Sequence, residues 1–525
     1  MKKRNLLIGL LGTTALLLAA CGGQKAEKDS TGAETSPNAA ADTFTYAISG
    51  DPTSLNPINT SDRWGLTVTN MIYSPLVRVE GDGTLKNELA QEVKTSPDGL
   101  TVTVDLKPDI KWSDGQPLTA DDVVFTYEQK VKKENGNADS LWVADKPITV
   151  EKVDDDTVDF KLPSVSGAAV NNIATETYII PKHIFEKEPD FSVNELQAQP
   201  VGTGPYKMTE YKRGEYLRFE ANDSYYGGKP QIKNITLRII ASADTTKVAL
   251  QKGEVDASFV LPSDIADLDT KTITTYPYSE NRIGYLGLNT KTENLKDVKV
   301  RQAVLYALNK AELDKAAYLD EKYYEEPVSI LPPANPFATK DVESYQTDTA
   351  KSAELLKEAG VSGLTLTLGF GSSDPAQTIQ ATLIQQQLQK SGITVDLQGG
   401  DSTAIFTELK KAGSTKYDLF LGGYIMGNDP DLYSALFKSN GSANYFQYAD
   451  AQTDELFEKG AAELDEGKRK EIYNDLQAKI AADAVIYPIV DNKKILAVNN
   501  RISDVETAGL IPIYTFEDMS KLAVK

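Results

Sequence analysis

Cysteine and histidine are almost missing from this chain of 525 residues, which contains only Cys21 and His183 of these two types. A single cysteine excludes an internal disulfide framework. The pair also argues against a transition-metal site, because thiolate and imidazole are the ligands that such ions prefer. A serine triad would need His183 itself in a cleft, whereas its place two residues after Pro181 is typical of a helix start. The fold must therefore be held together by packing.

Long apolar runs are also scarce, since the sequence has only one, from Leu6 to Leu18. This run follows a basic start at 2–4 and is too short for a lasting membrane span, which is typical of a secretory signal. The tetrad LAAC at 18–21 has the pattern of a bacterial lipobox and predicts cleavage before Cys21, then acylation of Cys21 as a membrane anchor. The alternative is an ordinary signal peptide whose cleavage site happens to precede a cysteine. Both interpretations predict export across the cytoplasmic membrane.

Positive charge is in deficit, because 55 Lys and Arg face 76 Asp and Glu, for a formal net charge of -21. A surface of this sign repels nucleic acid and anionic lipid, which excludes both as partners. The hydrophobic fraction of 40% and the charged fraction of 25% are those of a globular protein. The length predicts about two to four domains.

Large apolar side chains are absent from residues 22–43, which are rich in Gly, Ser, Thr and Ala and are expected to form a disordered tether. Ordered sequence begins with the strand-like residues 44–48. Strands and helices then alternate to the end of the chain without a fixed-period repeat, which favours an α/β fold.

The clearest local pattern is a strand, helix, strand unit at 364–370, 376–390 and 393–397. If its strands pair in parallel, the crossover should be right-handed. Ligands of such sheets favour the carboxyl ends of strands, here 369–371. Other expected elements are strands at 100–106 and 486–490, a helix opened by Thr119, and helices at 300–308, 351–359 and 468–481.

Several motifs follow one another over nearly the whole chain, at 98–128, 200–207, 222–229, 250–257, 297–310, 418–437, 469–480 and 486–488. Examples are KPDIKWSDGQPLTADDVVFTYE in the first and PVGTGPYK in the second. In this order they resemble the extracellular solute-binding proteins of ABC importers, in the large oligopeptide- and dipeptide-binding family. The lipobox resembles the lipoprotein type of this family found in Gram-positive bacteria.

The resemblance implies two α/β lobes of the periplasmic-binding-protein type, an additional α+β domain and a ligand in the cleft between the lobes. The implied divisions are a signal peptide at 1–20, a lipidated Cys21 with a tether at 21–43, a discontinuous lobe I at 42–78, 199–283 and 490–525, an extra domain at 79–198, and lobe II at 284–489. Hinges between the lobes are expected near 199–201 and 281–284.

The implied function is that of a receptor, not an enzyme, which captures oligopeptides outside the cell and delivers them to an ABC permease. It would act as a monomer without a cofactor and touch the membrane only through its lipid. A cello-oligosaccharide or a metal chelate is the alternative ligand on the same fold. A surface-anchored hydrolase would require a clustered acid and base that the sequence does not reveal.

The main candidate for ligand contact is the loop at 424–431, between a strand that begins at Asp418 and a helix expected at 432–438. Its candidate residues are Tyr424, Met426, Asn428, Asp429 and Asp431. The family aspartate that pairs with the peptide amine aligns near Met426. Either Asp429 or Asp431 therefore takes this role, or the ligand has no free amine. Asp429 can instead cap the helix that follows it.

Four further candidates are Trp64 beside Arg63, Tyr285 and Asn289 on one alternating strand, and Tyr445, which alternates with Tyr448. Trp64 lies in an early loop that reaches the cleft in the resembling family, and Tyr285 follows the expected crossover between lobes. The chain has 25 tyrosines, so ordinary packing is the alternative for each tyrosine.

Overall fold

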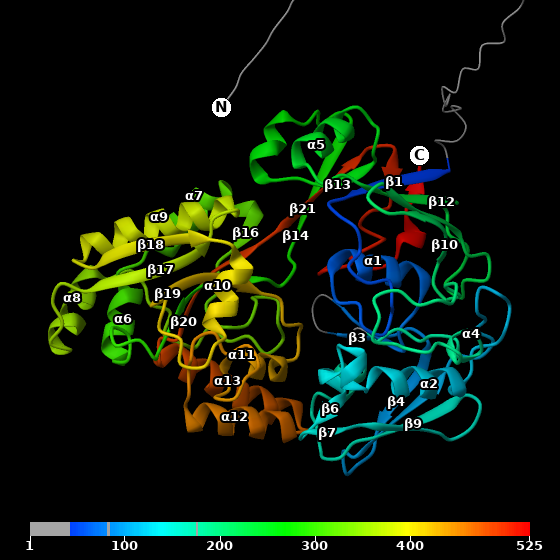
Figure 1. Cartoon of the computed structure of the whole chain (residues 1–525), viewed down its shortest axis with the longest axis horizontal. Coiled ribbons are helices and arrows are strands. Elements are labelled where there is room, and N and C mark those ends of the chain that lie inside the picture. The colour runs from blue at the N-terminus through cyan, green and yellow to red at the C-terminus, as the bar shows by residue number, and fades with distance from the viewer. Residues whose placement is uncertain (1–41, 81–83, 175–176) are drawn as a thin grey trace, which may run out of the picture.

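The computed structural model describes residues 42–80, 84–174 and 177–525, which form two large lobes and an extra domain (Figure 1). Cys21, the expected signal peptide and nearly all of the expected tether lie outside the described residues. Within the described ranges, no helix combines the length and the apolar character needed to cross a bilayer.

Lobe I is built on a seven-stranded mixed sheet. Its strands, in spatial order, are β10 (Tyr206–Lys212), β11 (Tyr216–Ala221), β12 (Asn234–Ile239), β1 (Thr43–Ile48), β13 (Ala257–Phe259), β21 (Lys494–Asn499) and β14 (Ile273–Tyr278). The first strand of the described chain thus pairs in parallel with β12 and β13 in the middle of the sheet. Lobe I therefore closes only when segments far apart in sequence meet.

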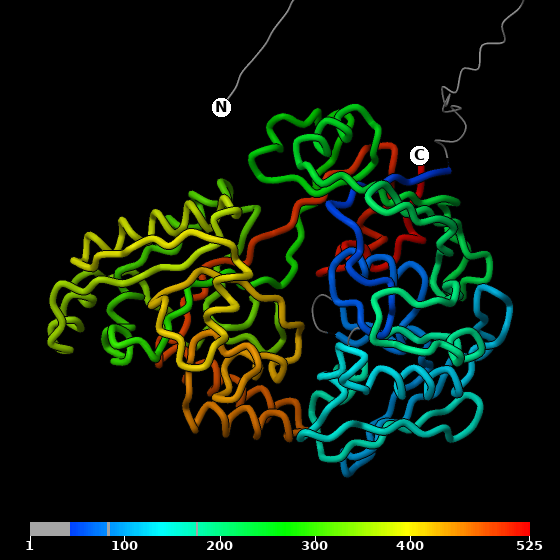
Figure 2. Tube along the Cα trace, in the orientation of Figure 1, coloured from blue at the N-terminus to red at the C-terminus, as the bar shows by residue number. Residues whose placement is uncertain are grey.

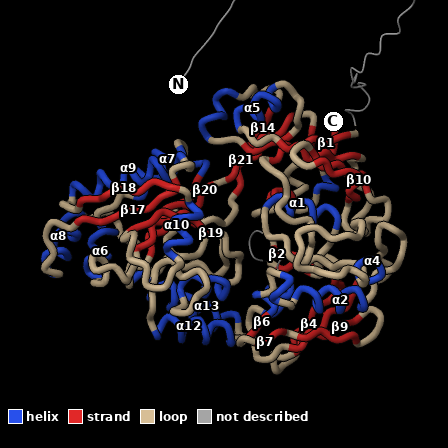
Figure 3. The backbone as a smooth tube through the Cα atoms, viewed as in Figure 1, coloured by secondary structure: helices blue, strands red, loops and turns tan. Residues whose placement is uncertain are grey.

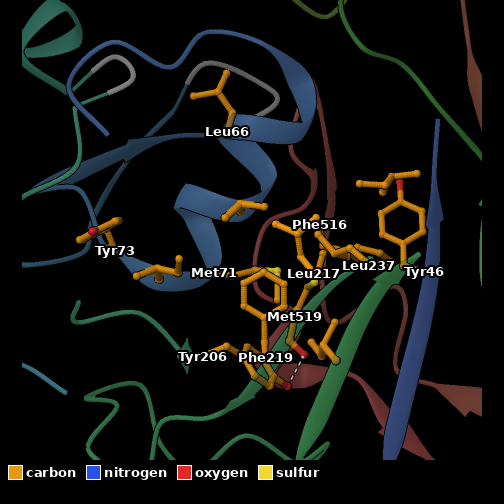
Figure 4. Close-up of a cluster of buried hydrophobic side chains, with 14 of the residues drawn as sticks. Tyr46, Leu66, Met71, Tyr73, Tyr206, Leu217, Phe219, Leu237, Phe516 and Met519 are labelled. Carbon is orange, nitrogen blue, oxygen red and sulfur yellow. Dashed lines mark hydrogen bonds between the residues drawn. The ribbon is translucent and has the colours of Figure 1, made fainter. Parts of the chain in front are cut away.

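One face of this sheet is covered by α1 (Arg63–Ile72), as Figure 4 shows. Asp62 caps the helix by accepting hydrogen bonds from the backbone N–H groups of Trp64 and Gly65. The helix packs Leu66 and Met71 into the same core as strand residues and the C-terminal Phe516. Helix α5 (Ala243–Gln251) contributes Ala249 and Leu250 to a smaller core on the other face.

The extra domain has a four-stranded antiparallel sheet and several short elements. Its strands, in spatial order, are β4 (Ala90–Thr95), β5 (Thr101–Leu106), β9 (Thr157–Lys161) and β8 (Thr149–Lys152). Its other elements are β2 (Val77–Val79), β3 (Leu85–Asn87), β6 (Trp142–Val143), β7 (Lys146–Pro147), α2 (Ala120–Lys130), α3 (Ala169–Ala174) and α4 (Lys182–Phe185). The predicted helix start at Thr119 is confirmed, because the Asp122 carboxylate accepts a hydrogen bond from the Thr119 N–H at 2.9 Å.

His183 is the second residue of α4, a helix that directly follows its N-cap Pro181. The Nε2 of His183 lies 2.8 Å from a carboxylate oxygen of Asp114. The predicted helix start is thus confirmed. Trp112 in the neighbouring turn is fully buried, as packing predicts.

Lobe II contains a six-stranded sheet with helices on both faces (Figure 3). Its strands, in spatial order, are β16 (Tyr324–Glu325), β20 (Ile486–Asn492), β15 (Ile283–Leu288), β19 (Leu419–Tyr424), β17 (Thr365–Gly371) and β18 (Thr394–Gly400). Strands β17 and β18 pair directly in parallel, and α9 (Pro375–Lys390) connects them in sequence. The predicted strand, helix, strand unit is thus confirmed.

The helices of lobe II divide between two cores. One core takes residues from α6 (Val298–Tyr306), α7 (Lys310–Tyr318), α8 (Thr349–Glu358) and α9, and the other from α10 (Ser402–Leu409), α11 (Ser434–Phe437), α12 (Ala451–Ala462) and α13 (Glu466–Ala482). Alternate residues of β15 enter opposite cores, so all six of its residues are buried. Small strands β22 (Ile502–Ser503), β23 (Leu510–Ile511), β24 (Thr515–Phe516) and β25 (Ala523–Val524) complete the C-terminal part of lobe I.

Two short segments connect the sheets of lobes I and II, as the green and red parts of the trace show (Figure 2). They are residues 279–282, between β14 and β15, and Lys493, between β20 and β21. Strand β20 extends to Asn492, two residues beyond the expected boundary at 490. The expected hinge at 281–284 begins within the first connection.

The expected hinge at 199–201 is wrong as a connection between the lobes. This segment joins the extra domain to β10 of lobe I and does not reach lobe II. It leads into Gly202 and Gly204, where an added Cβ would collide with the backbone of Ile72. The Gly202 carbonyl also accepts a hydrogen bond from the Ser113 N–H at 2.9 Å. The close backbone packing fixes the chain at this crossing.

Candidate ligand-binding cleft

A cavity of about 400 Å³ lies where lobe I, the extra domain and lobe II meet. Lobe I contributes residues 511–514. The extra domain contributes β2 and a group of residues that are far apart in sequence: Asn137, Ser140, Asn171, Ala174, Thr177 and Tyr178. Lobe II contributes residues 425–428 and Leu432, and Asn281 comes from the connection between the lobes. The cavity therefore has walls on both sides of the hinge, which is where lobe movement would open or close it.

The predicted loop contributes to this cavity with only part of its residues. Met426 and Asn428 line the cavity. Tyr424 is buried in lobe II, where its hydroxyl donates a hydrogen bond to the Ile330 carbonyl at 2.6 Å. Residues 369–371 are not among the lining residues, and the side chains of Gln377 and Ser402 lie beside Gly371. The loop after the neighbouring strand β19 lines the cavity in their place.

Asn428 connects three parts of the molecule through its hydrogen bonds. Its Nδ2 donates to the backbone carbonyl of Glu80 at 2.9 Å, across the cleft. Its Oδ1 accepts a bond from Asn281 at 3.3 Å, and its carbonyl accepts one from Asn335 at 2.9 Å. Asn281 has a φ of 54°, a left-handed conformation that asparagine tolerates better than most residues. A hinge residue, a cleft residue and the opposite wall are thus directly linked.

Asp429 points into lobe II and forms a bidentate ion pair with Arg469, with N···O distances of 2.7 and 2.8 Å. Both side chains are 6% exposed. Asp429 also caps the short 3₁₀ helix Pro430–Tyr433 by accepting a hydrogen bond from the Asp431 N–H at 2.9 Å. Burial, and next the negative charge of Asp429, raises the pKa of Asp431 to about 6. The helix-capping alternative for Asp429 is what the structure shows.

Tyr285 and Asn289 lie inside lobe II rather than on the cleft. The Tyr285 ring packs at 5.4 Å from Tyr424 and 5.5 Å from Phe446. The Asn289 amide donates to the carbonyls of Ser414 and Tyr417 at 2.8 and 3.1 Å. Tyr285 lies in β15, whose alternate side chains enter the two cores of lobe II, and Asn289 directly follows this strand.

Trp64 and Tyr445 are half-buried and are not among the residues that line the cavity. Trp64 donates from Nε1 to the Ser49 hydroxyl at 3.2 Å, and the Tyr445 ring packs against Phe406 at 4.8 Å. Arg63 has an indirect role, because it pairs with buried Glu280 at 2.7 Å and donates to the carbonyl of cavity-lining Ile513 at 3.0 Å.

Among the cavity residues that the sequence did not single out are Arg78, Glu80, Tyr178 and Tyr514. Arg78 lies in the middle of β2, a strand of only three residues, and Glu80 directly follows the strand. No local motif marks such a position, and only the meeting of β2 with the loop after β19 places it in a cleft. Burial, and then the nearby charge of Glu517, raises the pKa of Glu80 to about 7.

The extra domain also touches lobe II at a second place, away from the cavity. The Gly167 N–H donates to the Ala461 carbonyl of α12 at 2.7 Å, and an added Cβ on Gly167 would lie 2.3 Å from the Glu463 carbonyl. Leu464 is similarly close to Gly99. These contacts hold the extra domain against lobe II.

The cavity wall can bind through apolar contact, amide hydrogen bonds and charge. Its apolar side chains include Val77, Met426, Leu432, Ile511 and Ile513. Among the described residues, no group of three or more His, Cys, Asp or Glu is placed to hold a metal ion. A small volume, apolar walls and a few polar groups are typical of a binding site for an organic ligand.

Comparisons with known proteins place this arrangement in a family. A model described as bacterial extracellular solute-binding proteins, family 5 (middle part), matches residues 84–445. The chain is 30% identical to the oligopeptide-binding protein AppA of Bacillus subtilis, over 92% of this chain and 93% of that protein. The crystal structure of the ABC transporter substrate-binding protein CtaP of Listeria monocytogenes is 38% identical and matches with a TM-score of 0.88, over 92% of this chain and 99% of that one. A putative peptide-binding protein AppA of Clostridium difficile is 34% identical, with a TM-score of 0.85 over 92% and 100% of the two chains.

Proposed function

This chain belongs to family 5 of the bacterial extracellular solute-binding proteins, and from this premise we propose that it captures short peptides and delivers them to an ABC permease. The family is one of solute-binding proteins rather than enzymes. Its relatives AppA are named for oligopeptide or peptide binding. The observation that carries the proposal is the cavity of about 400 Å³ between the lobes.

The chemistry of this cavity supports a peptide ligand. Apolar side chains from both lobes can contact ligand side chains, and the amides of Asn137, Asn171, Asn281 and Asn428 can exchange hydrogen bonds with a peptide backbone. The volume lies at the lower end of the range for small-ligand pockets. A short peptide is therefore favoured over a long one. A metal chelate is disfavoured by the missing cluster of ligating side chains among the described residues.

The experiment is mass spectrometry of the small molecules released when the protein, purified from its own host, is denatured. We expect peptides of about two to four residues. Recovery of a sugar or a metal complex in place of peptides would contradict the proposal and support one of the alternatives for this fold.

We also propose that Met426 and Asn428 contact the ligand and that Asn428 holds the closed lobes together. Replacing Asn428 with Ala removes the 2.9 Å bond to Glu80 and the contact with Asn281. We expect peptide affinity to fall about tenfold, since a hydrogen bond contributes about 0.5–1.5 kcal/mol. Small-angle scattering with saturating peptide should show less compaction than in the wild type.

The matched control for this variant is Asn440→Ala, because Asn440 is an exposed asparagine of the same lobe and does not line the cavity. It should bind peptide as the wild type does. Equal affinity and equal compaction in the two variants would rule out a role for Asn428 in closure.

We further propose that the protein is a monomer anchored outside the membrane by lipid on Cys21. One chain supplies every described wall of the cavity, so a monomer suffices for binding. The lipobox at 18–21 and the polar residues from 22 to 41, which precede β1, support an anchor separate from the folded part.

Changing Cys21 to Ala should release the protein from the membrane without changing its peptide affinity. The physical reason is that several acyl chains are needed for stable anchoring and their attachment requires the cysteine. Fractionation of cells and binding measured on the released protein provide the two readouts. Membrane retention of the variant after salt washing would overturn the anchor, and Ser30→Ala in the same stretch is the control.

A further inference from the structure

Glu80 has an unusual position in the cleft wall. It directly follows β2, and its backbone carbonyl accepts the bond from Asn428 across the cleft. The side chain is 21% exposed, and Oε1 is buried without a hydrogen-bond donor in the part of the chain that the structure describes. A buried carboxylate oxygen that lacks a donor is unfavourable unless a ligand supplies one.

Glu80 is also one of only two charged side chains among the described residues that line the cavity, the other being Arg78. The Arg78 guanidinium already has partners, because Nη1 donates to Asn70 at 2.9 Å and Nε donates to Glu88 at 3.3 Å. Two of the three nitrogen atoms of the Arg78 guanidinium are thus engaged by protein groups. Glu80 is the anionic side chain among the described lining residues, so it is the group that can recognise a positive charge on a ligand.

The surroundings of Glu80 contain more negative than positive groups. Lys86 lies 3.9 Å from both Glu80 and Glu88 and also forms an ion pair with Glu517. Three carboxylates therefore share Lys86 and Arg78. Among the described residues, one negative charge of this cluster remains without a cationic partner, which burial makes costly. The raised pKa of Glu80 agrees with a proton held by this cluster near neutral pH.

We propose that Glu80 binds a primary ammonium group of the ligand. The proposal rests on the proposed function of the cleft as a peptide site. It assigns to Glu80 the role that the sequence left open between Asp429 and Asp431. Asp429 is engaged by Arg469, and neither aspartate is among the residues that line the cavity.

When the ligand ammonium binds, it takes the place of a proton on Glu80, so the charges balance. Below neutral pH, the protonated Glu80 carboxyl releases its proton to solvent as the ligand ammonium approaches, and the resulting carboxylate accepts hydrogen bonds from the ammonium. Near pH 7 and above, the carboxylate is already ionised and less proton is released. Affinity for the ammonium should therefore rise with pH up to about neutrality.

The experiment uses pools of synthetic tripeptides made from Ala, Leu, Met, Phe and Lys, each in a free and an N-acetylated form. Native mass spectrometry identifies the bound members, and calorimetry measures their affinity for the wild type and for Glu80→Gln. We expect the wild type to prefer free amines by about 30-fold to 1000-fold and Glu80→Gln to lose most of this preference. Retention of N-acetylated peptides only when they contain Lys would identify the lysine side chain as the ammonium source.

A second measurement uses the wild-type protein, so its result does not depend on whether a variant folds. Calorimetry at pH 5.5 in buffers of different ionisation enthalpy should detect about one proton released per free-amine peptide, with affinity about tenfold weaker than at pH 7. The variant Glu517→Gln should keep the amine preference but bind with less pH dependence, because it removes the neighbouring charge and not the cavity carboxylate.

The outcomes separate this inference from the proposed function. If the wild type binds tripeptides without preference for a free amine, or if Glu80→Gln keeps the full preference, the role of Glu80 is wrong and peptide binding still stands. If the wild type retains no member of either pool while sugars or other solutes bind, the proposed function fails first.

Discussion

Replacing Asp429 with Asn should destabilise lobe II by about 3–5 kcal/mol while changing peptide affinity less than threefold. The substitution leaves Arg469 charged and without its bidentate partner in a site where both side chains are 6% exposed. Removing one member of a buried pair costs this much because the remaining charge keeps its desolvation penalty without compensation. Denaturant unfolding monitored separately from calorimetric binding distinguishes the two quantities.

The matched control is Asp431→Asn, two residues from Asp429. Asp431 has no ion-pair partner within the part of the chain that the structure describes, and its pKa is raised to about 6 by burial and by Asp429. The variant Asp431→Asn removes a like charge, so above pH 6 it should retain or slightly exceed the stability of the wild type. If Asp429→Asn instead weakens peptide binding strongly without loss of stability, Asp429 is a ligand contact and the assignment of Glu80 is overturned.

The double variant Asp429→Leu with Arg469→Met supplies a further test of the cause. Replacing a whole buried ion pair by apolar side chains is often neutral or stabilising. We therefore expect the double variant to recover most of the stability lost by Asp429→Asn. Failure to recover it would show that the cap on Pro430–Tyr433, rather than the buried charge, carries the effect.

Asp314→Asn should stabilise the protein at alkaline pH by about 2–4 kcal/mol and have little effect at pH 4. Asp314 is fully buried in α7, and neither carboxylate oxygen has a hydrogen-bond partner within the described ranges. Burial, and then the charge of Glu326, raises its pKa to about 8, against the opposing effect of Lys310. Lys310 donates to the Pro327 carbonyl at 2.7 Å rather than to Asp314.

The direction of this pH dependence follows from the raised pKa of Asp314. A carboxyl whose pKa is raised by folding is harder to ionise in the folded state than in the unfolded state. The free energy of unfolding of the wild type should therefore fall as pH rises from about 4 to about 8, and the variant should not show this loss. Calorimetric unfolding at pH 4, 6 and 8.5 measures the difference.

Asp396→Asn is the control for this experiment, because Asp396 is exposed on β18 of the same lobe. It should change stability by less than about 0.5 kcal/mol at every pH. Parallel pH profiles for Asp314→Asn and the wild type would contradict a buried, largely neutral Asp314. Such a result would instead indicate that Lys310 compensates the carboxylate.

Local sequence pattern was sufficient to predict a helix or strand whose apolar spacing and caps lie within one segment. The β17, α9, β18 unit and α13 were predictable because their apolar spacing and caps lie within a few dozen residues. The same reasoning did not reveal that Tyr285 and Asn289 are buried within lobe II. Alternation marks two different environments, and in β15 both environments are apolar cores because helices cover both faces of the sheet.

The sequence by itself determined the family, the two-lobed α/β class with an extra domain, most elements and the two alternatives for Asp429, since these rest on local spacing and motif order. Only the tertiary structure decided which residues face the cleft. Glu80 and Asn428 are 348 positions apart and meet by a hydrogen bond between opposite walls. Asp429, next to Asn428, turns the other way because Arg469 from α13 supplies a buried partner. No local pattern encodes the pairing of charges on distant elements. This pairing is the reason that Asn428 lines the cavity while Asp429 supports the fold.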